Sequence, residues 1–152
     1  MSDEIDVVNK PQHYGDIFAM KHTQCRAIAR LLNFDAGCCW KYIWRAAKKE
    51  CKEDPKQDLK KAINYLNDWA ELYELRDGHD IGDYTAAKLL FNQLEEPDEY
   101  TQPIDHLKWE ILQEILNDTT DVPARLDSFG GIASAIDDLC GALYGSGLND
   151  GD

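Results

Sequence analysis

The chain has 152 residues, of which 43% are hydrophobic and 10% aromatic. This length and composition are typical of one globular domain with its own hydrophobic core. No apolar run approaches the ~20 residues of a membrane-spanning helix, and the acidic residues 1–6 lack the cationic start and apolar segment of a secretory signal. We therefore expect a soluble cytoplasmic protein without a membrane partner.

The formal net charge of −13 is unevenly distributed along the chain. Residues 1–76 hold 13 of the 16 Lys and Arg against 12 Asp and Glu, whereas residues 77–152 hold 3 against 17. Such asymmetry indicates a charge-directed partner, either another molecule or the opposite half of the same chain.

The five cysteines are an odd number, and Cys38 and Cys39 are adjacent, so a disulfide framework is not expected. His22 and Cys25 stand three residues apart, but no paired Cys-x-x-Cys or His-x-x-x-His spacing accompanies them. The cysteines therefore favour small buried thiols between helices, and no metal site is predicted from them.

The first ordered feature in chain order is the segment 10–15, where a proline fixes one backbone angle and a glycine permits a turn. It predicts a loop that presents Lys10, His13 and Tyr14. A plain N-terminal turn with a surface histidine is the alternative.

Two helices are predicted next. Thr23 is a candidate N-cap for a helix to residue 33, and Asp35 is a candidate cap for a second helix that runs to the low fifties. Cations recur at helical spacing on one face of this second helix: Lys41, Arg45, Lys48 and Lys52. An apolar stripe lies beside them: Trp40, Trp44, Ala47 and Cys51. This helix therefore combines a packing face with a basic face.

The third helix has the clearest pattern. Asp54 and Pro55 form a turn signal, Asp58 lies in the first helical turn, and Gly78 ends the segment. The apolar positions form one stripe: Leu59, Ala62, Ile63, Leu66, Trp69, Ala70 and Tyr73. We expect this stripe to be buried.

The acidic half contains three further amphipathic segments, at residues 83–94, 104–116 and 128–144, and Pro123 is expected to interrupt the chain before the last of them. No segment alternates with period two. The sequence therefore predicts an all-α fold, with a compact unit of about three helices at 8–76, an acidic helical extension at 77–145 and a disordered tail at 146–152.

The polar groups of the first half suggest an anion site. If the second and third helices are antiparallel neighbours, the end of one and the start of the other bring Lys48, Lys49, Asp58 and Lys61 together. Lysine and arginine bind phosphate, and a nearby aromatic ring can stack on a base. Such a cluster could position and stabilise a transferring phosphoryl group without a glycine-rich loop.

The segments Lys10-Pro11-Gln12-His13-Tyr14, Phe34-Asp35-Ala36-Gly37 with Lys41 to Lys49, and Asp58 to Leu66 together resemble a small bacteriophage family. Its members are mostly proteins of unknown function, and some are described as deoxynucleoside monophosphate kinases without a P-loop. The resemblance covers residues 8–75. The chain departs from it at Cys38 and Ala47, where relatives often carry Asn and Gly.

The resemblance implies a phage protein of the infected bacterial cytoplasm that forms a homo-oligomer and handles nucleotides. It implies three catalytic residues: His13, Arg45 and Asp58. It also implies a set of substrate-binding residues: Lys10, Tyr14, Lys41, Tyr42, Lys48, Lys49 and Lys61. No protein metal ligands are predicted, and Mg²⁺ is a possible cofactor of the phosphates.

Four alternatives remain open. The scaffold could sequester a nucleotide without turning it over, or the acidic half could bind and inhibit a host defence or DNA-binding protein. That half could also be only a solubilising appendage. A helical pyrophosphohydrolase would need paired carboxylates for magnesium, for which Asp68 with Glu71 and Asp137 with Asp138 are the candidates. Nucleic acid is disfavoured because the acidic half repels a polyanion.

Overall fold

The computed structural model describes residues 22–46, 48, 54–94, 97–117 and 121–145, and all regular structure in these ranges is helical. The six helices are α1 (His22–Ala29), α2 (Phe34–Arg45), α3 (Pro55–Leu75), α4 (Tyr84–Phe91), α5 (Pro103–Ile115) and α6 (Val122–Tyr144). The predicted all-α class is therefore confirmed. None of the described helices is both long and apolar enough to cross a membrane.

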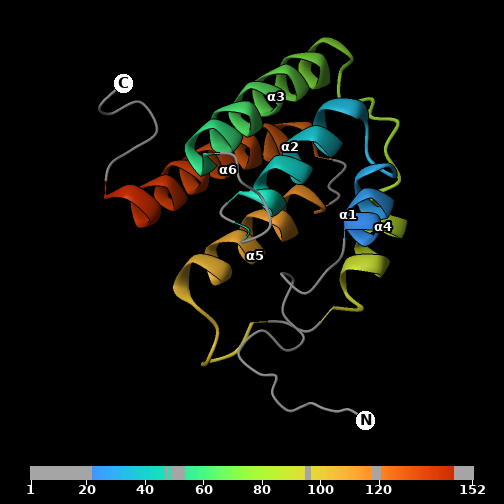
Figure 1. Ribbon diagram of the computed structural model, residues 1–152. Helices are drawn as coiled ribbons and strands as arrows, with labels where there is room; N and C mark the ends of the chain where they lie inside the picture. Colours follow the sequence, from blue (N-terminus) through green and yellow to red (C-terminus); the bar gives the residue numbers. More distant parts are fainter. Residues whose placement is uncertain (1–21, 47, 49–53, 95–96, 118–120, 146–152) are drawn as a thin grey trace.

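The long helices α3 and α6 lie alongside each other, and α2 packs between α3 and α5 (Figure 1). The contacts of α2 run through aromatic rings. Trp40 meets Phe91 at 5.9 Å between ring centroids, and its Nε1 donates to the carbonyl of Leu112 at 3.1 Å. Across the molecule Trp69 meets Phe129 at 4.6 Å. The two halves of the chain thus share one hydrophobic core.

The start of α2 differs from the prediction. Asn33, not Asp35, is the N-cap, and its side-chain oxygen accepts a hydrogen bond from the Ala36 amide at 2.8 Å. Asp35 lies in the first turn, where its charge complements the helix dipole. Asn and Asp are both favoured N-cap residues, and the helix begins after the earlier of the two, Asn33.

The end of α2 also differs. The predicted helix into the low fifties stops at Arg45, because Ala46 has an extended ψ of 125°. The ammonium group of Lys108 on α5 donates to the carbonyls of Trp44 at 2.8 Å and Ala46 at 2.5 Å. These contacts bind the carbonyl end of α2. Lys48 therefore lies beyond the helix, and Lys52 lies outside the described residues.

The third helix follows its pattern closely. Asp54 is the N-cap and accepts from the Lys56 amide at 3.0 Å, and Pro55 occupies the first turn. Five positions of the predicted stripe are buried, namely Leu59, Ala62, Leu66, Trp69 and Tyr73, whereas Ile63 and Ala70 are partly buried. After Leu75 the amide of Gly78 bonds to the Tyr73 carbonyl and that of Asp77 to the Glu74 carbonyl, which is a Schellman motif with Asp77 at φ 53°.

Helix α4 begins after Asp83, whose side chain accepts a hydrogen bond from the Ala86 amide at 3.0 Å. The segment predicted at residues 83–94 therefore begins where expected. Helix α6 begins at Val122, so Pro123 does not interrupt it. The first helical turn tolerates proline because its amides have no intrahelical partner. Helix α4 buries Tyr84, Ala87 and Phe91, whereas Leu90 is 37% exposed.

Candidate functional site

The described residues include part of the predicted nucleotide site. Lys10, His13, Tyr14 and Lys49 lie outside them. The remaining members come from α2, α3 and the segment after α2: Lys41, Tyr42, Arg45, Lys48, Asp58 and Lys61.

An aromatic pair joins α2 to α3 at this site. The rings of Tyr42 and Tyr65 are stacked, with centroids 5.9 Å apart and an interplanar angle of 14°. Phe34, at the start of α2, meets the same Tyr65 ring edge-on at 5.9 Å. The three rings form a row along the junction of the two helices.

Three cations surround the Tyr42 ring. The ammonium groups of Lys41 and Lys61 lie 4.5 and 5.4 Å from its centroid, and the guanidinium carbon of Arg45 lies 5.5 Å away. Each can be attracted by the ring face. Helix α2 supplies two of the cations and α3 the third, so the positive charge depends on how the helices pack. All four side chains are partly exposed.

Arg45 is positioned by a buried carboxylate. Its Nε lies 3.4 Å from Oδ2 of Asp58, whose side chain is fully buried, while the Arg45 side chain is 24% exposed. A buried charge needs a partner of opposite sign, so Asp58 holds the guanidinium at the end of α2. Because Asp54 caps α3, capping does not account for Asp58.

Lys48 lies over a different aromatic ring from the other three cations. Its ammonium group lies over the Trp44 ring, 4.6 Å from the centroid. Trp44 is 4% exposed and Trp40 is fully buried, so both indoles belong to the core, as expected from their stripe. Of the two tyrosines predicted for this site, Tyr42 lies within the described residues and is partly exposed.

Cys38 lies beside the aromatic pair. Burial raises the pKa of its thiol, and this outweighs the lowering by Lys41 and by a hydrogen bond with Tyr65. The thiol is therefore neutral at neutral pH. It behaves as a small side chain at the edge of the site and not as a nucleophile.

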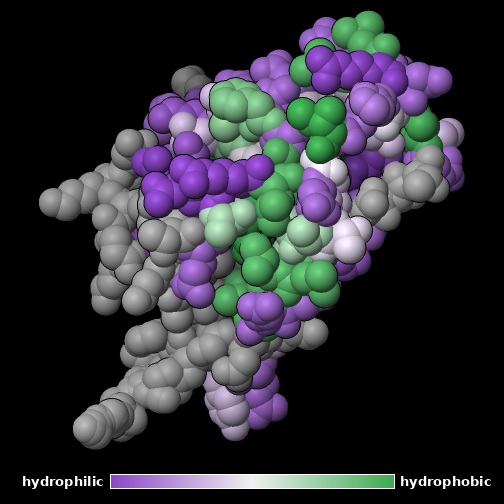
Figure 2. Space-filling model, turned by 90° about the vertical axis from the view of Figure 1, so that its right-hand side faces the viewer, coloured by the Kyte–Doolittle hydropathy of each residue, from purple (hydrophilic) through white to green (hydrophobic). Residues whose placement is uncertain are grey.

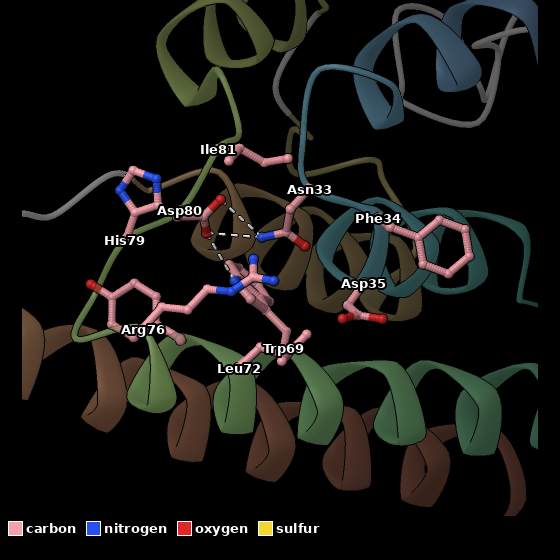
Figure 3. A pocket seen from close by; sticks show the side chains of 10 residues that line it. Asn33, Phe34, Asp35, Trp69, Leu72, Arg76, His79, Asp80 and Ile81 are labelled. Carbon is pink, nitrogen blue, oxygen red and sulfur yellow. Dashed lines mark hydrogen bonds between the residues drawn. The ribbon is translucent and has the colours of Figure 1, made fainter.

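A hollow that the sequence did not predict lies beside Asp80 (Figure 3). The Asp80 carboxylate accepts hydrogen bonds from four groups: Asn33 Nδ2 at 2.9 Å, Trp69 Nε1 at 3.0 Å, the Tyr84 hydroxyl at 2.8 Å and the Gly82 amide at 2.9 Å. Burial alone raises the pKa of Asp80, but these hydrogen bonds outweigh it and lower the pKa. Asp80 thus organises the loop between α3 and α4.

The cavity beside Asp80 has a volume of about 190 Å³. Trp69 and Tyr73 contribute its aromatic wall, and Phe34, Leu72 and Ile81 stand among its lining residues. The sequence signals for this cavity are Asn33 in the break before α2 and Asp80, which stands between Gly78 and Gly82. Neither signal predicts that the two segments meet.

Residues 8–67 match the model of a family of unknown function, DUF3310. No curated protein and no solved structure matches the chain. The matched segment includes the six described residues of the predicted site and ends before Trp69 and Asp80. The cationic cluster therefore lies in the part of the chain that resembles DUF3310, whereas the Asp80 cavity is completed by residues beyond it.

Proposed function

We propose that the face formed by α2 and α3 binds a nucleotide, with its phosphates on Lys41, Arg45 and Lys61 and its aromatic part near Tyr42. The observation that supports this proposal is the cluster of three cations from two helices around one partly exposed ring. Phosphate favours clustered lysine and arginine, and a tyrosine ring adds a stacking surface for a base. A ligand with both an anionic and an aromatic part uses both features.

The chemistry that we propose is phosphoryl transfer to a deoxynucleoside monophosphate from a nucleoside triphosphate. This step depends mainly on positioning and on charge stabilisation, which fixed cations supply. Arg45 is suited to the transferring group because Asp58 fixes its direction. His13, with Lys10 and Tyr14, would complete the site, and Mg²⁺ would accompany the phosphates. A phage origin, the bacterial cytoplasm and a homo-oligomer belong to the same proposal.

Binding is tested first. A panel of deoxynucleoside mono- and triphosphates is screened for a rise in melting temperature, since a ligand at about 100 times its Kd adds about 2.7 kcal/mol of stability. Calorimetry then gives Kd for the wild type and for Lys61→Met. The lost charge-assisted contact predicts binding about tenfold weaker, equivalent to ~1.4 kcal/mol.

Lys60→Met is the matched control, because Lys60 is the neighbouring cation on α3 and acts on Asp54 instead. It should leave Kd unchanged. Arg45→Met alone is a poor probe because it strands the buried Asp58 carboxylate, so Arg45→Met/Asp58→Asn is the variant to assay. No stabilisation by any nucleotide at millimolar concentration would refute the proposal.

Turnover is measured separately by chromatography of each monophosphate after incubation with ATP and Mg²⁺. Formation of the diphosphate, lost in the Arg45→Met/Asp58→Asn variant, supports the kinase. Tight binding of a nucleotide that is recovered unchanged instead identifies a sequestering protein on the same face.

A further inference from the structure

Large apolar side chains are unusually exposed around the Asp80 cavity. We call four of them the apolar rim: Phe34 (74% exposed), Leu72 (38%), Leu75 (76%) and Ile81 (73%). Three of them line the cavity, and Leu75 follows Leu72 by one helical turn of α3. Figure 2 shows hydrophobic surface gathered on the side of the molecule that carries α1 and α4. Apolar surface grouped around a hollow is typical of an interaction site.

The cavity wall is rigidly supported. Trp69 stacks on Tyr84 with centroids 6.2 Å apart at 9°, and the buried guanidinium of Arg125 lies 4.6 Å from the Trp69 ring. Both rings donate to Asp80. Because these groups are held by packing and by hydrogen bonds, the hollow exists before any ligand arrives, which lowers the cost of binding.

The charged residues that line the cavity are two aspartates and one arginine. Asp35 lines it, and burial and the nearby Asp68 both raise the pKa of Asp35, against an opposing effect of Arg76. Arg76 is the one Lys or Arg among the cavity's lining residues, against Asp35 and Asp80. A cation from a partner would relieve the repulsion between Asp35 and Asp68.

We propose that the apolar rim and the Asp80 cavity dock a basic segment of a partner protein. One aromatic or aliphatic side chain of that segment enters the cavity, and flanking Lys or Arg residues face Asp35 and Asp68. The volume of about 190 Å³ suits a single side chain, being smaller than the ~300–1,000 Å³ of pockets for drug-sized ligands. The carboxylates also repel nucleic acid.

This site adjoins the proposed nucleotide face through Phe34, whose ring meets Tyr65, but none of the cations of that face lines the cavity, so the two proposals can fail separately. The test uses the full chain labelled with ¹⁵N and three capped pentapeptides. The first is Arg-Ser-Trp-Ser-Arg, the second reverses both charges to Glu, and the third replaces the Trp anchor with Gly.

The first peptide should give saturable shifts of the Trp69 indole and of the Asp35 and Ile81 amides. The other two should bind at least tenfold more weakly, and high salt should weaken the first. Equal binding of the first and third peptides, or shifts centred on Tyr42, would overturn the proposal.

Substitutions then locate the contact. Ile81→Ser should weaken the first peptide at least fivefold, and Leu89→Ser is the matched control because Leu89 is 63% exposed on α4 and does not line this cavity. An unchanged Trp69 indole signal in the free variants shows that the fold is intact. Equal losses in both variants, or a concentration-dependent self-association that Ile81→Ser removes, would contradict a basic partner; the latter would assign the rim to a second copy.

Discussion

Lys108→Met should destabilise the fold by about 2–5 kcal/mol. Lys108 is 2% exposed, and its ammonium group donates to the carbonyls of Trp44 and Ala46. Methionine keeps most of the side-chain volume, so little cavity forms. It leaves two buried carbonyls without this donor, at a cost of about 1–3 kcal/mol each. Removing the ammonium group also removes the free-energy cost of burying its charge. The two carbonyl groups belong to the backbone, however, and they stay buried without a donor.

The measurement is urea denaturation followed by far-UV circular dichroism, with the m-value compared between variants. Lys88→Met on α4 is the control, because Lys88 is only partly buried and no carbonyl at the end of α2 depends on it. Hydrogen exchange should show the loss of protection first at the last turn of α2. A loss below about 0.5 kcal/mol, the usual range for surface substitutions, would refute the role given to Lys108.

Three further predictions concern buried or strained groups. Arg45→Met should lower the free energy of unfolding by about 3–5 kcal/mol, because it leaves the buried Asp58 carboxylate without its cation. Arg45→Met/Asp58→Asn should lower it clearly less, because the second change removes that charge. Equal losses of the two variants in urea denaturation would contradict the ion pair. Asp80→Asn should destabilise at pH 7. Since the folded pKa of Asp80 is lowered, its stabilisation is present above the unfolded pKa of about 3.8 and fades as pH falls further, so the two denaturation midpoints should converge only in acid. Asp77→Gly should raise stability by ~0.5–1 kcal/mol because Asp77 occupies the left-handed region at φ 53°, and a lower melting temperature would refute this.

The helices themselves could be predicted because their apolar positions repeat at the helical period. The stripe of α3 from Leu59 to Tyr73 is buried as expected, and Asp83 begins α4 as expected. The end of α2 could not be predicted. Its stop depends on Lys108, which lies more than sixty residues further along the chain. No local pattern carries that information.

The candidate functional site was likewise predictable only in part. An antiparallel arrangement of α2 and α3 was assumed from the sequence, and the structure places Arg45 beside Asp58 and Lys61 beside the Tyr42 ring. Lys48 was expected on the same helical face, but it follows the end of α2 and lies over Trp44. The Asp80 cavity could not be found, because its parts come from the break before α2, from α3 and from the loop before α4.

The acidic half contributes its cations to the interior. Of its three Lys and Arg residues, Lys108 and Arg125 are buried. Lys108 binds the carbonyl end of α2, and Arg125 donates to the carbonyls of Glu114 and Ile115 at the end of α5. Cations at helix C-termini complement the dipole. Lys88 is thus the only Lys or Arg of this half that is not buried, and the half carries 17 carboxylates against three cations.

This charge distribution discriminates between anionic ligands by their size. The cluster around Tyr42 acts strongly within the Debye length of about 8 Å at physiological ionic strength. A mononucleotide bound as proposed would fit within that range and would meet mainly Lys41, Arg45 and Lys61. A nucleic acid extends beyond it and meets the uncompensated carboxylates of the acidic half, which oppose polyanion binding. The excess of carboxylates in the acidic half would therefore favour a small phosphorylated ligand over a polymer at the proposed face.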